Sequence, residues 1–211
     1  MFVFSDTFLY EIVLLLIMRR EKKNKLFSKK NIVSIFIIFI MVSSAIGYMF
    51  GKDSGTSQKY NGYKFLQKGR SWALRIEGNE LLFDFLPGDL ENIAIDEGVK
   101  GILSEKVQID TTSDGDDELK EAIAKAQYDM TEILGLASET YVRIGLSEEN
   151  EIGLPMIDCE SATASVPVVY FLKANETSVK IEGNCVVAKA KNDLEMLAIK
   201  DLMIYEILGI I

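Results

Sequence analysis

The sequence predicts an α+β domain, in which a mixed sheet is packed by two main amphipathic helices, preceded by a single N-terminal transmembrane helix. An uncharged apolar run occupies residues 32–50. Beyond it, short segments with alternating apolar residues indicate strands, and two longer segments repeat apolar residues at helical spacing. The expected parts are a basic tail over 1–31, the transmembrane helix over 32–50, a linker over 51–59 and the domain over 60–211.

The apolar run is the clearest signal in the chain. Its nineteen residues carry no charge, and at 1.5 Å per residue they nearly cross a hydrocarbon core of roughly 30 Å. Seven basic residues precede the run: Arg19, Arg20, Lys22, Lys23, Lys25, Lys29 and Lys30. Because basic flanking segments stay cytoplasmic, we expect a single-pass protein of the cell membrane with a cytoplasmic N-terminus and an extracytoplasmic C-terminal domain.

Two alternatives concern the N-terminus. Ser43-Ser44-Ala45 places small residues where a signal peptide is cleaved, although the apolar run continues to Phe50, as suits a signal-anchor. Residues 1–17 are apolar but short, and they carry two acidic residues. We interpret them as an upstream extension before a true start at Met18, or as a short helix on the membrane surface.

The predicted domain has a β-meander over 60–95 and an α/β core over 106–211. The meander has strands at 60–65, 72–77 and 81–85. The core begins with a strand at 107–109, a helix at 119–134 stopped by Gly135, and a strand at 141–144. This order predicts a right-handed crossover between two parallel strands.

The last third of the chain predicts three more strands and a helix. Segments 168–172, 178–181 and 185–188 are separated by short turns, which favours an antiparallel meander. Asn192 and Glu195 are typical of a helix start. The following residues form one apolar face: Leu194, Leu197, Ala198, Leu202, Tyr205 and Leu208.

Charge and composition exclude several function classes. Of the 23 basic and 32 acidic residues, seven and three lie in residues 1–51, which leaves the remainder with a net charge of −13. Nucleic acid and anionic lipid would be repelled by such a domain. The chain has no histidine, which excludes histidine-based triads and most catalytic zinc sites. Neither of the usual glycine-rich phosphate-binding motifs is present.

Two features agree with an extracytoplasmic domain. Cys159 and Cys185 are the only cysteines, and an even pair in an oxidising compartment predicts a structural disulfide bond. The acidic neighbours Asp158 and Glu160 would raise a thiol pKa, which disfavours a reactive cysteine. Asn175-Glu176-Thr177 is a glycosylation sequon in a polar break between two apolar runs.

The acidic segment 110–121 resembles a twelve-residue calcium loop in part. Its third position is Thr, and a strand rather than a helix precedes it, so the fit to such a loop is incomplete. The alternative is an acidic start to the following helix, with Ser113 or Asp114 capping free amides. No other cofactor is expected. The oxygen donors of the proposed loop are Asp110, Thr112, Asp114, Asp116, Glu118 and Glu121.

Several segments carry a family resemblance. These are Cys159-Glu-Ser-Ala-Thr, Val166–Tyr170, Glu182–Cys185, Ile204–Gly209 and the opening Tyr60–Phe65. In these segments the chain resembles uncharacterised archaeal single-pass membrane-anchored proteins with an extracytoplasmic two-cysteine α+β domain. The resemblance covers most of residues 60–211, rests on structural residues and implies no activity.

We therefore expect a membrane-anchored module of the cell envelope rather than an enzyme. It would contact the lipid bilayer through residues 32–50 and bind another envelope protein, a glycan or a cation, or assist an assembly. The alternative is an extracytoplasmic enzyme without histidine, either a carboxylate-based hydrolase or one that uses thiol and disulfide chemistry. The candidate carboxylates are Asp84, Asp89, Asp158 and Glu160.

Overall fold

The computed structural model describes residue 33, residues 35–43 and residues 56–211. Residues 33 and 35–43 are helical, and their side chains are exposed. The basic tail, the start at Met18, the cleavage site after Ala45 and the rest of the predicted span lie outside the described residues. Among the residues that are described, no helix is both long and apolar enough to cross a membrane. Residues 56–211 belong to one compact unit.

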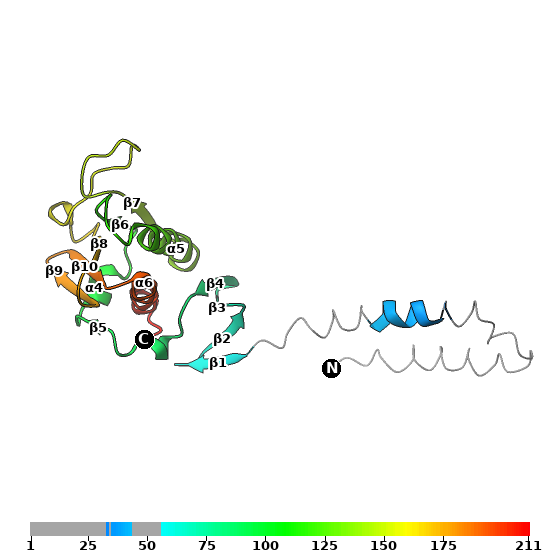
Figure 1. The fold of residues 1–211 in the computed structure, drawn as a ribbon. Helices are drawn as coiled ribbons and strands as arrows, with labels where there is room; N and C mark the ends of the chain where they lie inside the picture. Colours follow the sequence, from blue (N-terminus) through cyan, green and yellow to red (C-terminus); the bar gives the residue numbers. More distant parts are fainter. Residues whose placement is uncertain (1–32, 34, 44–55) are drawn as a thin grey trace, which may run out of the picture. The chain divides into compact units, whose positions relative to one another are not determined.

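The unit opens with an antiparallel sheet of four strands in sequential order (Figure 1). Its strands are β1 (Ser57–Tyr60), β2 (Tyr63–Lys68), β3 (Ser71–Ile76) and β4 (Asn79–Phe83). β1 lies partly in the segment expected to be a linker. The turn between β1 and β2 has positive φ at both Asn61 and Gly62, which is the geometry that tight hairpins need and that Asn-Gly favours.

The second sheet is mixed and has six strands in the order β5-β9-β10-β8-β6-β7. β6 and β7 are parallel and are joined through helix α5, which confirms the predicted strand-helix-strand unit with parallel strands. β8 is also parallel to β6. The strands are β5 (Ala94–Ile95), β6 (Gln108–Thr112), β7 (Tyr141–Ile144), β8 (Val168–Lys173), β9 (Ser178–Glu182) and β10 (Cys185–Ala190).

The antiparallel meander expected for the last three strands is wrong. β10 lies between β8 and β9 and runs parallel to β8. Its apolar residues explain this position, because Val186 and Val187 point to opposite faces and both are buried. A strand that is apolar on both faces belongs in the middle of a covered sheet. The α+β class with a mixed sheet is confirmed.

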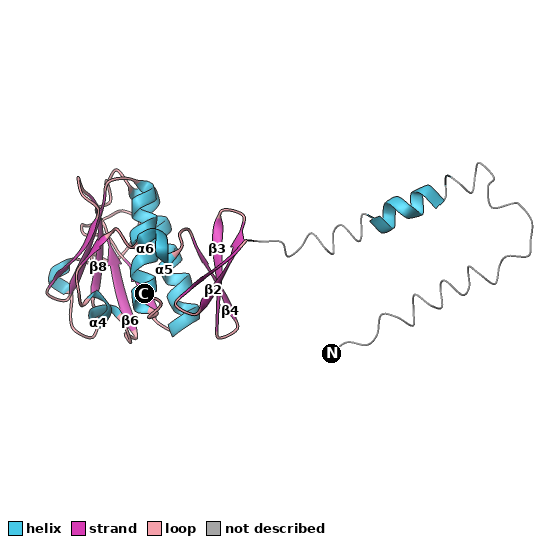
Figure 2. Ribbon diagram, turned by 90° about the horizontal axis from the view of Figure 1, so that it is seen from below, coloured by secondary structure: helices cyan, strands magenta, loops and turns pink. Residues whose placement is uncertain are grey.

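Two long helices, α5 (Lys120–Ser138) and α6 (Asp193–Ile207), lie between the two sheets (Figure 2). α5 continues past Gly135 and ends where Glu139 adopts a left-handed conformation. Two short helices, α3 (Pro87–Leu90) and α4 (Val99–Leu103), precede β6. Side chains from both sheets join α5 and α6 in a single core, including Phe65 and Phe83 from the first sheet and Phe171 from the second.

Helix α6 is not amphipathic, contrary to expectation. Ten of its residues are buried, whereas Leu194, expected on its apolar face, is 68% exposed. The reason is its place in the middle layer, where sheets cover it on two sides and α5 lies beside it. A helix that is covered all round needs apolar residues all round.

The face of the six-stranded sheet opposite the helices is covered by the long connection from β7 to β8. This connection contains a 3-10 turn, η1 (Cys159–Ser161), and its Ile157 packs against Val168 and Val187. The predicted disulfide bond is present between Cys159 and Cys185, with Cα atoms 5.2 Å apart. It ties the connection to the central strand of the sheet.

Candidate functional site: a buried charge network beside a cavity

The middle of helix α6 carries two charged residues, Lys200 and Asp201, whose side chains are completely buried. Nζ of Lys200 lies 2.6 Å from Asp201 Oδ1, 2.9 Å from Asp129 Oδ2 on α5 and 3.0 Å from Asp84 Oδ2 just after β4. One ammonium group therefore joins the first sheet to both central helices.

A second ammonium group contacts the same two carboxylates from the solvent side. Nζ of Lys125 lies 2.6 Å from Asp129 Oδ2 and 3.0 Å from Asp84 Oδ2. Lys125 is 46% exposed, whereas Lys200 is fully buried. We call these five residues the charge network. It contains two cations and three carboxylates, so it carries a net charge of −1 when all five groups are ionised.

Asp201 also fixes the chain that leaves β4. Its Oδ2 accepts hydrogen bonds from the backbone N–H groups of Asp84 at 2.8 Å and Phe85 at 2.9 Å. The hydroxyl of Tyr205, one turn later on α6, donates to the carbonyl oxygen of Phe85 at 2.7 Å. The Tyr205 ring packs 4.4 Å from that of Phe83, measured between centroids. Polar and aromatic contacts thus hold the same short segment, Asp84 and Phe85, which we call the junction after β4.

The surroundings of each group shift its pKa. Burial raises the pKa of Asp201 to about 6, because the Lys200 ammonium and the Phe85 amide offset it only in part. Burial would also raise the pKa of Asp84, but Lys200 and Lys125 outweigh it and hold that pKa below its usual range. Burial would lower the pKa of Lys200, yet Asp201 and Asp129 keep it above its ordinary value. Lys200 therefore stays protonated at neutral pH.

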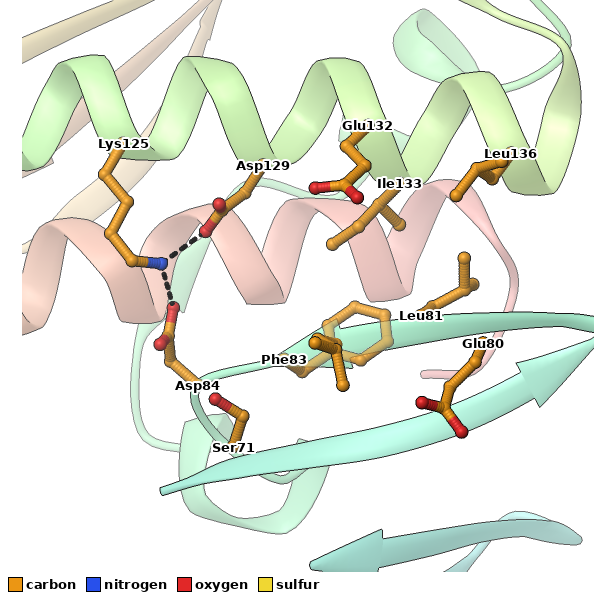
Figure 3. Close-up of a pocket in the computed structure, with 11 residues that line it drawn as sticks. Ser71, Glu80, Leu81, Phe83, Asp84, Lys125, Asp129, Glu132, Ile133 and Leu136 are labelled. Carbon is orange, nitrogen blue, oxygen red and sulfur yellow. Dashed lines mark hydrogen bonds and ion pairs between the residues drawn. The ribbon is translucent and has the colours of Figure 1, made fainter. Parts of the chain in front are cut away.

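A cavity of about 190 Å³ lies beside the charge network, between β4 and α5. Figure 3 shows Lys125, Asp84 and Asp129 at one end of it and Leu81 and Leu136 toward the other. Two further carboxylates line the cavity, and the remaining lining is largely apolar. The complete lining is Ser71, Glu80, Leu81, Leu82, Phe83, Asp84, Lys125, Asp129, Glu132, Ile133 and Leu136.

This lining suits binding better than catalysis. Four carboxylates and one ammonium group line the cavity, and its apolar side chains would contact a hydrocarbon stem. Asp84 and Asp129 are paired with the two lysines of the charge network and Glu80 is paired with Lys68, so among the described residues Glu132 is the lining carboxylate left for a cation. A lysine, an arginine or another amine with an apolar tail combines both features. Asp201, whose raised pKa would suit a general acid, does not line the cavity and is fully buried. It therefore has no access to a substrate there.

The other carboxylates considered for catalysis lie apart from this cavity. Asp158 caps η1, accepting a hydrogen bond from the backbone N–H of Ser161 at 2.9 Å. Asp89 is exposed in the first turn of α3, and Glu160 is exposed in η1. Of the four candidates only Asp84 lines the cavity, and both lysines of the charge network contact it. Both cysteines are joined in the disulfide bond.

The acidic segment 110–121 is distributed over strand, loop and helix. Asp110 is buried in β6 and pairs with Arg143, whose Nε lies 3.0 Å from its Oδ1. The Thr112 hydroxyl donates to the carbonyl oxygen of Ile157 at 2.7 Å. Asp114 accepts from the Tyr170 hydroxyl at 2.6 Å, and burial together with this contact raises the pKa of Tyr170 to about 12.

The remaining residues of this segment lie in the turns before α5 and in its first turn. Asp116, Glu118 and Glu121 are exposed. Asp117, rather than Ser113 or Asp114, accepts from the backbone N–H of Leu119 at 2.7 Å. Across residues 33, 35–43 and 56–211, no three or more acidic or cysteine side chains are grouped so that they could hold a metal ion. Calcium binding stays a prediction.

Sequence reasoning missed most of the charge network. Of its five members only Asp84 was singled out, as a candidate carboxylate. A signal was present, because Lys200 and Asp201 interrupt the apolar run from Leu197 to Ile204. Charged residues inside an otherwise apolar helix are rarely buried unless they are paired. Their partners on α5 and after β4 are distant in sequence and carry no motif.

Comparison with known proteins places the chain in no family. No family model matches it, and no significant match is found among curated proteins or solved structures. The resemblance to archaeal membrane-anchored proteins finds no support in these comparisons.

Proposed function

We propose that the chain is a membrane-anchored, extracytoplasmic module of the cell envelope that binds a partner protein through the cavity between β4 and α5. The main support for the membrane anchor is the helical segment formed by residues 33 and 35–43. Every one of its side chains is exposed, and almost all are large and apolar; Phe39, for example, is 67% exposed and Met41 68%. Such a surface is stable in lipid rather than in water.

Three further features support an extracytoplasmic location of the C-terminal domain. The basic residues at 19–30 precede the apolar run, as in segments that stay cytoplasmic. The Cys159–Cys185 disulfide bond persists in oxidising compartments. Asn175 is exposed in the turn between β8 and β9, where a glycan can be attached without disturbing the core.

The cavity supports binding of a cationic group. Glu132 lines it together with Leu136 and Phe83, so an arginine or lysine side chain would find a carboxylate for its charge and apolar contacts for its stem. An exposed basic residue on another envelope protein has this chemistry.

Membrane extraction and surface labelling test the anchor. The full chain is expected to remain in the membrane pellet at alkaline pH, and a membrane-impermeant amine reagent is expected to label its C-terminal domain on intact cells. A variant with Ile37→Lys and Phe39→Lys should leave the membrane fraction, whereas Ser57→Lys with Gln58→Lys should not. Extraction of the unaltered chain, or labelling only after permeabilisation, would contradict the proposal.

Titration with an alkylguanidinium salt tests the cavity. With the full chain in detergent micelles, amide chemical shifts are expected to move in β4 and α5 at millimolar concentrations. Glu132→Gln should weaken the effect several-fold, and Glu121→Gln, an exposed change on the same helix outside the cavity, should not. Shifts scattered over the domain, or equal in both variants, would rule out this site.

A further inference from the structure

The four-stranded sheet has an outer face that points away from the helices. Its inner face carries Phe65, Leu74, Leu81 and Phe83, which pack into the shared core. Because side chains alternate along a strand, the residues between these point outward. The outer face is defined by three rows of neighbouring residues across the strands.

The first row is mainly basic. The register pairs Lys59 with Lys64 and Arg75 with Glu80. The pairing of Phe65 with Leu74 places Lys64 beside Arg75 one step further along. Three cations thus occupy neighbouring positions on three strands, and one carboxylate ends the row. Lys59, Lys64 and Arg75 are exposed.

The second row is apolar and the third adds another cation. Leu66 pairs with Ala73, and Ala73 pairs with Leu82, which is 50% exposed. Lys68 lies in the third row, 2.6 Å from the carboxylate of Glu80. The outer face therefore carries four cations and one acid, in a domain whose overall charge is strongly negative.

A hollow of about 270 Å³ lies on this face. Lys64 and Arg75 line it together with Leu66, Ala73 and one carboxylate, that of Glu80, which lies 3.8 Å from the Arg75 guanidinium group. Cross-strand neighbours have Cβ atoms about 5 Å apart, so both cationic groups can reach one phosphate. Ala73 is buried, and Leu82 is the exposed member of the apolar row that can contact the first carbons of an acyl chain. A guanidinium group binds phosphate through paired hydrogen bonds.

The position of the sheet in the chain favours the membrane as the source of that phosphate. Six residues separate Phe50, the end of the apolar run, from Ser57, the first residue of β1. Even fully extended, six residues reach only about 20 Å. A chain anchored through residues 32–50 keeps this sheet near the bilayer surface.

We propose that the outer face of the four-stranded sheet binds the phosphate headgroups of anionic lipids in the membrane that anchors the chain. The inference rests on the proposed anchor. It also revises the expectation drawn from net charge, because the local excess of cations on this face differs in sign from that of the whole domain. Each cation held near an anionic membrane surface raises the binding constant for that membrane about fivefold.

Lysine footprinting of the full chain in lipid nanodiscs tests the proposal. Nanodiscs made from zwitterionic lipid alone are compared with nanodiscs containing a third of phosphatidylglycerol, and acetylation rates are measured by mass spectrometry. Lys59, Lys64 and Lys68 are expected to react several-fold more slowly in the anionic discs, and 0.5 M salt should remove the protection. Lys180 and Lys189 on the second sheet should react equally in both.

Variants and controls separate the outcomes. Lys64→Glu with Arg75→Glu should abolish the protection of Lys59 and Lys68, whereas Lys180→Glu with Lys191→Glu, an equal change of charge elsewhere, should preserve it. Equal acetylation in both kinds of disc would overturn lipid binding while leaving the anchor intact. Protection that is independent of lipid charge, or that inorganic phosphate alone produces, would also overturn it. A chain that does not enter nanodiscs at all would overturn the anchor and this inference together.

Discussion

Lys200 and Asp201 are consecutive residues of α6, yet their side chains form an ion pair of 2.6 Å within the protein interior. Consecutive residues on a helix point about 100° apart and do not normally face each other. They meet because both also bind the junction after β4: Lys200 through the Asp84 carboxylate, and Asp201 through the Asp84 and Phe85 amides. The charge network therefore fixes how the first sheet docks on the helices.

Replacing Lys200 by methionine is expected to destabilise the fold strongly. The change leaves the buried Asp201 without its cation, and removing one partner of a buried ion pair costs about 3–5 kcal/mol. Lys191→Met removes a lysine that is 51% exposed and 3.4 Å from Glu195, and it should change the free energy of unfolding by less than about 0.5 kcal/mol. Urea unfolding measures both; equal midpoints would show that Lys200 is dispensable.

The raised pKa of Asp201 predicts a pH-dependent difference between the native chain and Asp201→Asn. A carboxyl whose pKa rises from 3.8 to about 6 on folding stabilises the fold below pH 3.8 and loses that contribution as the pH rises through 6. Between pH 4 and pH 7, the advantage of the native chain over Asp201→Asn should therefore shrink by about 2 kcal/mol. Asp193→Asn, an exposed change at the start of α6, is the control. If the free energies of unfolding of the native chain and of Asp201→Asn change in parallel with pH, the raised pKa of Asp201 is contradicted.

Two glycine substitutions should have opposite effects. A Cβ on Gly145, just after β7, would lie 2.5 Å from the carbonyl oxygen of Pro155 and 2.6 Å from Ile157 Cδ1. Gly145→Ala should therefore cost about 2–3 kcal/mol through overpacking. Gly135 is exposed within α5 with open space around its Cα, so Gly135→Ala should stabilise the helix by about 0.5–1 kcal/mol. Thermal unfolding of the two variants should show shifts of opposite sign.

Loss of the disulfide bond should destabilise the domain without removing a core side chain. Cys159 and Cys185 are 26 residues apart in sequence, and closing a loop of this length stabilises a fold by about 3.5 kcal/mol. Unfolding with and without reductant measures this contribution. Alkylation of the denatured, unreduced chain should modify neither cysteine, and labelling of both would show that the bond is absent.

The sequence predicted the elements whose signals are local. The strand-helix-strand crossover, the antiparallel meander at the start and the cysteine pair all followed from short-range patterns. The position of β10 did not, because its placement depends on what covers each face of the sheet. The unbroken run Cys185-Val-Val-Ala, without alternation, was the available sign that both faces are buried.

The candidate site was less accessible to such reasoning. Lys125 and Asp129 are one helical turn apart on α5 and resemble an ordinary surface pair. Only the fold brings Lys200 from α6 to within 3.0 Å of both Asp129 and Asp84. The outer face of the first sheet was equally hidden, since its cations are spread over three strands and only the register aligns them.

The burial of α6 on all sides has a consequence for export. An apolar helix of this kind, entering the translocation channel unfolded, risks being released sideways into the lipid. Lys200 and Asp201 stand near the middle of its fifteen residues, and each adds about 2.5–3.5 kcal/mol to the free energy of insertion. In a chain exported as we propose, the pair that secures the folded core also lets the same segment pass through the membrane.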